Sequence, residues 1–486
     1  MPLFVFIWLI LNVRSATSFM HIYPLGALDG AAGKAMCTKN TENSDVSTVI
    51  DLQLHTRRKP PSDFLSSLSE DCEKLGVDAF DLYGDFASDA QTSHLRRFES
   101  EVANHFGKED AVFCLSGGMA QCIALAINGR RKSDSQGGKK AKAFACHPTS
   151  HLLLHENDNF HELLGMQAIV LNVDKEESSY NPDHLKDYGC YGMSPIRLSH
   201  AKDLFAKIDG TELTGTNTST IYPNSSTPVG STDLSTFILE LPHREIGGKL
   251  TPWDEVEEIG RLCKARGVQF HCDGARIFEA SAGYGHTSVK QTAQPFSSVY
   301  ISFYKGLGNG IGGAMLLGNS DFCAEARVWL RRFGGNLYSV LPYSVASWAG
   351  WQKNCLQAEN GTCTTKVFHQ RQKKLARILN ILQSDSTISS IVVSDPSTPE
   401  TNMVHGYLKM SYEECVAALK SAEEHTGIRV LSRLRRCGST NDNMHYHSEF
   451  GCRFEWVMGE SNFMIKDDIF ITGWKAFAKA CKRQNT

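Results

Sequence analysis

The segment ISFYKGLGNGIGGAMLLG (residues 301–318) joins a lysine to a run of glycines, and three kinds of chemistry use such a combination. A phosphate-binding loop of the Walker type is excluded, because Lys305 precedes the glycines and no Ser or Thr follows a Gly-Lys pair. Gly308, Gly310 and Gly313 formally satisfy a dinucleotide fingerprint, but the apolar run after them has the length of a strand instead of opening a helix. What remains is a lysine near a strand end, with glycines that leave room for a planar group. Such a lysine can form an imine, although an exposed loop lysine is the alternative from this segment alone.

The segment VQFHCDGARIFEA (residues 268–280) supplies two groups that would suit a planar, anionic cofactor or substrate. Its alternating apolar residues predict a strand that delivers Asp273 at its end. The Asp273 carboxylate could keep a ring nitrogen protonated through a charge-assisted hydrogen bond of about 1.5–3 kcal/mol. Arg276 could bind a carboxylate with its forked donors. Taken alone, Asp-Gly is more often a turn, and Arg276 more often a surface or structural arginine.

The segment CLSGGMAQ predicts a glycine turn between a buried strand (residues 111–115) and a helix (residues 120–128). Ser116, Gly117 and Gly118 form this turn. Backbone N–H groups and the helix dipole favour a phosphate at such a position. An ordinary tight turn is the alternative.

The segment HPTSHLLLHE has three histidines at intervals of four, which would stack their imidazoles on one helix face. A metal site is not expected, because the pattern is HxxxHE instead of HExxH and no distant ligand cluster completes it. His147 and His155 are interpreted as polar or core histidines. His151 is the candidate to lie flat over a planar cofactor.

Strands and helices alternate around these segments. A helix is expected over residues 92–106, and a strand over 235–241 is followed by a helix over 252–264. Further strands are expected over 268–272 and 297–303. This alternation predicts a mostly parallel sheet with its sites at the carboxyl ends of the strands.

The composition describes an enzyme-sized globular chain. Its 486 residues are 41% hydrophobic and 21% charged, with a formal net charge of -3, which argues against nucleic-acid binding, a membrane channel and global disorder. Fifteen cysteines are too few for a disulfide scaffold, and none occur in paired CxxC units of the kind that bind zinc. Most of the cysteines are expected to be reduced and buried.

The N-terminus predicts a targeting segment. Residues 3–13 are apolar but too few to span a bilayer, and Arg14 and small residues follow, so a signal peptide is expected over 1–18 and a leader over 19–50. The sequence ATSF at residues 16–19 also resembles the cleavage region of bipartite plastid presequences. Secretory entry or a plastid is therefore expected, with no membrane span in the mature protein. The alternative is an apolar element packed on the body of a cytoplasmic protein.

The combination LSGGMA, SHLLLHE, ELPHREIGG, HCDGARIFEA, SFYKGLGNGIGGAMLLG and RRFGGNLY, in this order, resembles the threonine aldolase and aromatic amino acid β-eliminating lyase family of pyridoxal-phosphate (PLP) enzymes. The resemblance implies an α/β chain of fold type I, which is aspartate-aminotransferase-like, with a mostly parallel central sheet and a smaller C-terminal α+β domain. It implies a large PLP-binding domain over 51–340, with an insertion at about 185–235, and a small domain over 341–486. A homodimer or homotetramer is also implied.

The resemblance further assigns roles to individual residues. Lys305 would form the Schiff base with PLP, Asp273 would bind the pyridinium nitrogen and His151 would stack on the ring, so these three would be catalytic. Arg276 would hold the substrate carboxylate, with Arg453 in GCRFEW as its second ligand. The segment DLYGD (residues 81–85) would contribute near the site. The cofactor-binding residues implied are Ser116, Gly117, Gly118, His151, Asp273, Arg276, Ser302 and Lys305.

Several departures from the family pattern leave the substrate open. Gly118 stands where the family has a threonine, and Tyr338 stands where an arginine is common. The lysine lies in FYKGL instead of SKGL, and DLQLHT (residues 51–56) replaces the N-terminal serine-aspartate motif. The expected reaction is cleavage of a β-hydroxy-α-amino acid such as L-threonine or L-allo-threonine to glycine and an aldehyde. A β-eliminating lyase or dehydratase that releases ammonia, and a catalytically silent PLP-fold scaffold, are the alternatives.

Overall fold

The computed structural model describes most of the chain after residue 48. The described residues are 49–57, 59–82, 93–135, 141–173, 182, 185–186, 189–210, 221–223, 229, 233–356, 364–437 and 449–484. The signal peptide and leader predicted up to residue 48, residues 83–85 of DLYGD and much of the insertion predicted at 185–235 lie outside them. None of the described helices is long and apolar enough to cross a membrane.

The larger sheet is mostly parallel, as predicted. Its order among the described residues is β2-β9-β8-β7-β6-β3-β4-β5. Strands β8, β7, β6, β3 and β4 run parallel to their neighbours, whereas β9 and β5 are antiparallel to theirs. The bounds are β2 (Asp110–Cys114), β3 (Ala143–Cys146), β4 (Gln167–Val170), β5 (Ile221–Tyr222), β6 (Leu234–Glu240), β7 (Gln269–Gly274), β8 (Ser298–Ser302) and β9 (Ala314–Gly318).

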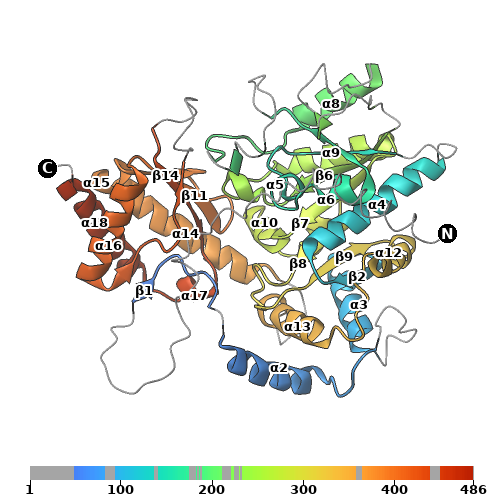
Figure 1. The fold of residues 1–486 in the computed structure, drawn as a ribbon, viewed down its shortest axis with the longest axis horizontal. Helices are drawn as coiled ribbons and strands as arrows, with labels where there is room; N and C mark the ends of the chain where they lie inside the picture. The colour runs from blue at the N-terminus through green and yellow to red at the C-terminus, as the bar shows by residue number, and fades with distance from the viewer. Residues whose placement is uncertain are drawn as a thin grey trace, which may run out of the picture. The chain divides into compact units, whose positions relative to one another are not determined.

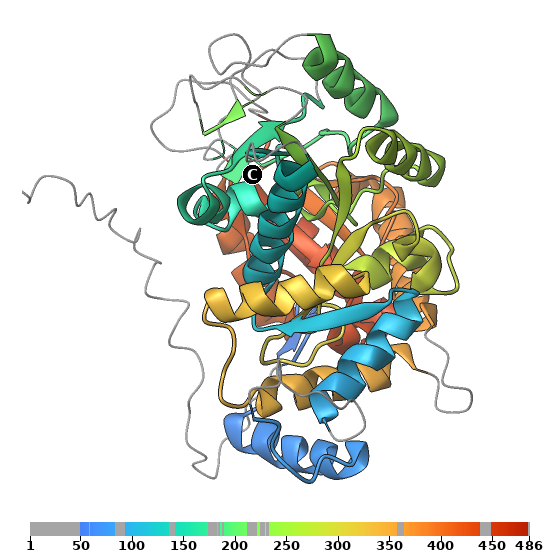
Figure 2. The ribbon, with the colours of Figure 1, turned by 90° about the vertical axis from the view of Figure 1, so that its right-hand side faces the viewer.

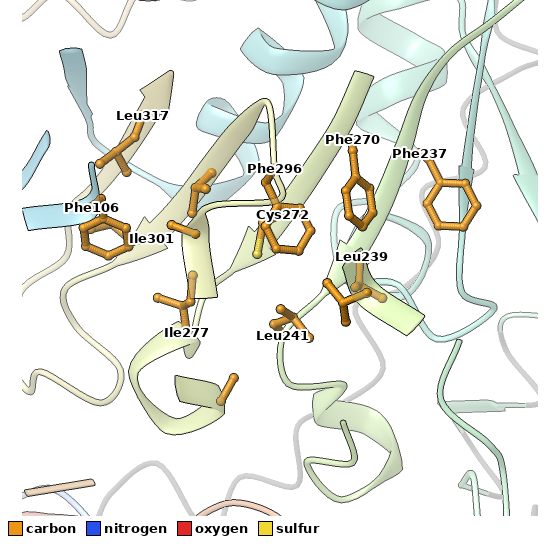
Figure 3. Packing of buried hydrophobic residues seen from close by; sticks show 14 of the residues in the cluster. Phe106, Phe237, Leu239, Leu241, Phe270, Cys272, Ile277, Phe296, Ile301 and Leu317 are labelled. Carbon is orange, nitrogen blue, oxygen red and sulfur yellow. The ribbon is translucent and has the colours of Figure 1, made fainter. Parts of the chain in front are cut away.

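The central strands are apolar on both faces because helices cover both sides of the sheet. Leu239, Cys272 and Ile301 point to one face (Figure 3) and belong to the largest apolar cluster. Ile238 and Tyr300, at alternate positions, point to the other face and join two smaller clusters. The parallel core therefore forms the middle layer of three.

Two sets of helices form the outer layers. Helix α3 begins after its N-cap Ser93 and ends at the left-handed Gly107, close to the predicted limits. Figure 2 shows α12 beside strand β2, on whose other side α3 packs. One layer contains α3 (His94–Phe106), α8 (Leu198–Gly210), α9 (Trp253–Ala265), α10 (Ile277–Gly283), α11 (Val289–Ala293) and α13 (Leu341–Cys355). The other contains α4 (Gly117–Ser135), α5 (His151–Leu154), α6 (Asn159–Leu164) and α12 (Ser320–Arg332).

The C-terminal part is a smaller α+β unit with its own apolar cluster. Its sheet has the order β10-β11-β14-β13 and is antiparallel. Helices α14, α16 and α18 cover one face of this sheet. The bounds are α14 (Lys366–Ser384), α15 (Ser386–Ser389), β10 (Val392–Asp395), β11 (Met403–Leu408), α16 (Tyr412–Thr426), β12 (Ile428–Arg429), β13 (Arg435–Arg436), β14 (Cys452–Val457), α17 (Glu460–Phe463) and α18 (Asp467–Gln484). The remaining elements are α2 (Pro61–Leu75) and the 3-10 helix η2 (Arg244–Ile246).

The division between the apolar cluster of the large sheet and that of the small domain does not fall at residue 341, where the domain boundary was predicted. Trp348 and Trp351 of α13, and Phe368 at the start of α14, pack in the cluster of the large sheet. At the other end of the chain, β1 (Ile50–Asp51) pairs with β12, and Leu52 lies in the cluster of the small domain. Figure 1 shows this blue strand among the orange and red elements. Long-range pairing of this kind leaves no periodic signal in the sequence.

Candidate active site

A cavity of about 980 Å³ lies between the carboxyl ends of the large-sheet strands and the small domain. Such an edge is the usual place for a site in a parallel sheet. The cavity brings together five residues that were predicted from separate segments, namely Ser116, His151, Arg276, Lys305 and Arg453. Tyr338, which replaces a common family arginine, is largely exposed and does not line it.

Lys305 follows the end of β8 by three residues and lines the cavity. Burial, followed by the nearby charge of Arg276, lowers the pKa of Lys305 from 10.5 to about 8, although Asp273 opposes this shift. Both main causes disfavour the ammonium form. Lys305 is therefore an amine with an appreciable uncharged fraction near neutral pH, which a nucleophile requires.

Asp273 is the penultimate residue of β7 and is only 2% exposed. Its Oδ2 accepts a hydrogen bond of 2.7 Å from Gln121 Nε2 on α4, and its Oδ1 accepts one of 3.2 Å from the amide of Ala275. Glu240 is its register partner on β6, and burial together with the Asp273 charge raises the pKa of Glu240 to about 8. Glu240 is therefore mostly protonated at neutral pH.

Helix α4 begins at Gly117, three residues before the predicted start at residue 120. Gly117 and Gly118 thus form its first turn instead of a separate loop. A Cβ at Gly117 would stand 2.1 Å from Tyr300 Oη, and a Cβ at Gly118 would stand 2.2 Å from Glu156 Oε2. A side chain at Gly117 would therefore have to displace the buried Tyr300 ring. Ser116 Oγ accepts a hydrogen bond of 3.3 Å from the Met119 N–H, and the N–H groups of Gly117 and Gly118 at the start of the helix suit a phosphate.

His151 begins the short helix α5 and lines the cavity. Its Nε2 lies 3.1 Å from Glu156 Oε1. The prediction that three histidines share one helix face was wrong, because α5 starts only at His151. His147 precedes the helix and is buried, with ring nitrogens bound to Thr149 Oγ1 and a backbone carbonyl. Burial lowers the pKa of His147 to about 4, so it remains neutral.

A buried charge network crosses the cavity wall from the large sheet to the small domain. Arg244, just after β6, contacts Glu245 at 2.5 Å and Glu455 of β14 at 2.9 Å. His155 Nε2 also lies 2.9 Å from Glu245 Oε1. The Arg244 charge holds the pKa of Glu455 well below its usual range, against the effect of burial. Both acids therefore remain ionised and neutralise Arg244.

Comparison with known proteins identifies the family. The model of the β-eliminating lyase family matches residues 81–404, about two thirds of the chain. The chain belongs to this family. A low-specificity L-threonine aldolase of Arabidopsis thaliana is 25% identical over 359 residues, which cover 72% of this chain and 84% of that protein. A solved putative L-allo-threonine aldolase of Listeria monocytogenes superposes with a TM-score of 0.66 at 27% identity, covering 89% of this chain and 97% of the other.

The fold also resembles that of a solved structure with much lower sequence identity. Serine palmitoyltransferase of Sphingomonas wittichii superposes with a TM-score of 0.54 at 12% identity, covering 90% of this chain and 87% of its own. At this identity the likeness concerns the fold alone, and it agrees with the predicted fold type I. The chain is thus a PLP-dependent lyase of the threonine aldolase type.

The cavity residues Ser116 and Lys305 fit pyridoxal phosphate together with Gly117, Gly118, Asp273 and Ser302, which are not themselves among the lining residues. The first turn of α4 and Ser116 offer donors for a phosphate, and Ser302 Oγ is buried with no hydrogen-bond partner in the described part of the chain. The Asp273 carboxylate, fixed by Gln121, suits a protonated ring nitrogen. The Lys305 amine suits the aldehyde. Phosphate, ring nitrogen and aldehyde therefore each find a matching group.

Sequence reasoning missed several residues of the site. Gln121, which holds Asp273, stands in the quoted segment CLSGGMAQ without a recognised role. Glu279 lines the cavity, is fully buried, and has its pKa raised to about 7 by burial. Arg371 reaches the cavity from α14 and donates to the carbonyl of Gly306 at 3.3 Å. Glu279 lies in the segment VQFHCDGARIFEA, so its nearness in sequence to Asp273 and Arg276 was an available signal. Arg371 belongs to no motif.

The described residues contain no cluster of three or more His, Cys, Asp or Glu side chains arranged to hold a metal ion. The thirteen described cysteines are free thiols, and most of them are buried. None of the described cysteines lines the cavity. Among the described lining residues, the side chains that can act on a substrate are therefore lysine, histidine, arginine, carboxylic acids and the hydroxyl groups of Ser, Thr and Tyr.

Proposed function

We propose that this protein cleaves a β-hydroxy-α-amino acid of the L-threonine or L-allo-threonine type into glycine and an aldehyde. The observation that carries the proposal is that His151, whose Nε2 lies 3.1 Å from Glu156, lines the same cavity as Lys305 and Arg276. Retro-aldol cleavage needs a base for the β-hydroxyl proton, in addition to a cofactor site. The similarity to threonine aldolases supports the same reaction.

Pyridoxal phosphate, when bound, withdraws electrons from the α-carbon of the amino acid. Lys305 Nζ would attach the cofactor through its free-base form, which a pKa of about 8 makes available near neutral pH. Asp273 would keep the ring nitrogen protonated, and Gln121 holds the Asp273 carboxylate in place. Ser116, Gly117, Gly118 and Ser302 would bind the phosphate.

The substrate would be oriented by its carboxylate. Arg276 can bind it with two parallel hydrogen bonds, and Arg453 from the small domain lines the same cavity. His151 would take the β-hydroxyl proton at Nδ1 while Nε2 faces Glu156, whose carboxylate stabilises the resulting imidazolium. Because the substrate is held beside this base, the proton transfer no longer requires two free reactants to meet in the right orientation, which lowers the entropic part of the barrier. By family resemblance we expect the protein to act as a homodimer or homotetramer.

Product analysis tests the proposal. The holoenzyme is incubated with L-threonine, L-allo-threonine and L-serine, and glycine, acetaldehyde and ammonia are measured. Glycine and acetaldehyde in equal amounts are expected from at least one threonine isomer, and Lys305→Ala is expected to abolish both. Ammonia without glycine would instead establish β-elimination and overturn the aldolase assignment.

A further inference from the structure

The sheet of the small domain presents a polar face to the cavity. Alternate residues of β14 point in opposite directions. Cys452 and Trp456 pack in the apolar cluster with α16 and α18, whereas Arg453 and Glu455 line the cavity. His405, the register partner of Glu455 on β11, lines the cavity as well. The part of the wall that the small domain supplies is therefore rich in charge.

Two arginines stand directly opposite each other on this face. Arg435 of β13 is the register partner of Arg453 of β14, and both line the cavity. Directly opposed residues have Cβ atoms about 4.5–5.5 Å apart, and like charges in this arrangement repel each other. Arg435 itself is exposed to solvent, and partial desolvation followed by the charge of Arg453 lowers its pKa. An anion between the two guanidinium groups would remove this repulsion.

The protein supplies little to neutralise this pair. Arg453 is only 4% exposed, and its Nε has no hydrogen-bond partner among the described residues, while its Nη2 donates to the carbonyl of Lys186. No carboxylate of the described chain lies within 4.0 Å of either Arg435 or Arg453. The wall thus offers unused donors that match an anion.

Three other arginines of the cavity have partners or roles of their own. Arg371 donates to the Gly306 carbonyl and to Asn354 Oδ1. Arg244 is neutralised by Glu245 and Glu455. Arg276, from the large domain, also lies beside Lys305, whose pKa it lowers, and it suits the α-carboxylate of a substrate. Arg435 is consequently surplus to the needs of an amino acid with one carboxylate.

We propose that the substrate carries a second carboxylate on its β-carbon, bound by Arg435 beside Arg453. The inference rests on the proposed function and narrows its substrate class to β-hydroxy-α-amino dicarboxylic acids. In such a molecule the two carboxylates are separated only by the α- and β-carbons, so neighbouring arginines can bind both. A phosphate is disfavoured, because Glu455 and Glu245 on the same wall repel a dianion more than a single carboxylate.

The reaction balances without any further reactant. In 3-hydroxyaspartate the Cα–Cβ bond breaks, the β-hydroxyl loses its proton, and the β-carbon becomes the aldehyde carbon of glyoxylate. The proton passes to the α-carbon, which leaves as glycine. No oxidant or reductant is consumed.

The experiment compares 3-hydroxyaspartate with L-threonine and L-allo-threonine in the wild type, Arg435→Gln and Arg436→Gln. Arg436 is the matched control: it is the next residue, carries the same charge, contacts Glu413 and does not line the cavity. We expect a higher kcat/KM for 3-hydroxyaspartate than for threonine in the wild type. Arg435→Gln should reduce the value for 3-hydroxyaspartate by about 10- to 100-fold, as expected for loss of a charge-assisted hydrogen bond, and leave that for threonine unchanged. Arg436→Gln should change neither.

A binding measurement separates failure of this inference from failure of the proposed function. Calorimetric titration of the holoenzyme with succinate and with butyrate should give tighter binding of succinate, and Arg435→Gln should remove the difference. If threonine is cleaved but 3-hydroxyaspartate is not preferred, the inference is overturned and the proposed function stands. If no hydroxy amino acid is cleaved, the proposed function fails, and equal binding of succinate and butyrate would overturn the anion site as well.

Discussion

Replacing Arg276 should change the titration of Lys305 by an amount that can be worked out in advance. With a pKa of about 8, Lys305 is uncharged in about a quarter of molecules at pH 7.5, against about one in a thousand for an ordinary lysine with a pKa near 10.4. Arg276 is the second cause of the lowered pKa, after burial. Removing a like charge at close range should raise the pKa of Lys305, by about one unit. The uncharged fraction at pH 7.5 should then fall about eightfold.

Reductive methylation of the cofactor-free protein measures this directly, because only the uncharged amine reacts. The rate at Lys305, followed by mass spectrometry of its peptide, should rise through a midpoint near pH 8 in the wild type and near pH 9 in Arg276→Gln. Arg433→Gln is the control, since Arg433 lines the same cavity but is not among the main charges acting on Lys305. A wild-type midpoint near 10.5, or the same midpoint in wild type and Arg276→Gln, would refute the reasoning.

Two further predictions concern the cofactor site and the core. Gly117→Ala should weaken binding of pyridoxal phosphate, measured by equilibrium dialysis, because the new Cβ would stand 2.1 Å from Tyr300 Oη. The double variant with Tyr300→Phe should recover part of the affinity, and no recovery would mean that this contact is not the cause. Arg327→Met should lower the free energy of unfolding by about 3 kcal/mol, because it leaves the buried Glu99 and Asp110 with one partner fewer. Arg131→Met is the control, because it removes an ion pair with Glu325 in which the arginine is partly exposed. In a thermal melt, this variant should lose far less stability than Arg327→Met, and equal losses of stability would contradict the explanation.

Short-range sequence patterns predicted the elements and the chemistry at the strand ends. The strand before Lys305 and the strand that ends at Asp273 were located from apolar alternation and from the residues that follow it. The strand after the glycines was also expected, and it is what excluded a dinucleotide loop. These features depend on neighbours within one element, so their signal lies within a few residues.

The rest of the site depends on contacts between distant segments. Gln121 holds Asp273 across 152 positions of sequence, and the Arg435–Arg453 pair exists only because β13 and β14 are in register. Similarly, Trp351 joins the core of the large sheet because of how α13 packs, although it follows the expected domain boundary. Neither residue type nor spacing encodes such pairings in a single sequence.

The pairing of β1 with β12 sets the order in which the cavity can be completed. Gln53 donates to the carbonyl of Glu455, which lies 402 positions further along the chain, and its neighbours His55 and Thr56 line the cavity. During synthesis on the ribosome, Lys305 and Asp273 emerge long before β14 does. Strand β1 and Gln53 therefore remain unpaired with β12 and β14 while the large sheet folds. The wall that encloses the reactive lysine closes only after β14 has emerged, so a nascent chain that lacks β14 cannot hold its cofactor in a closed site.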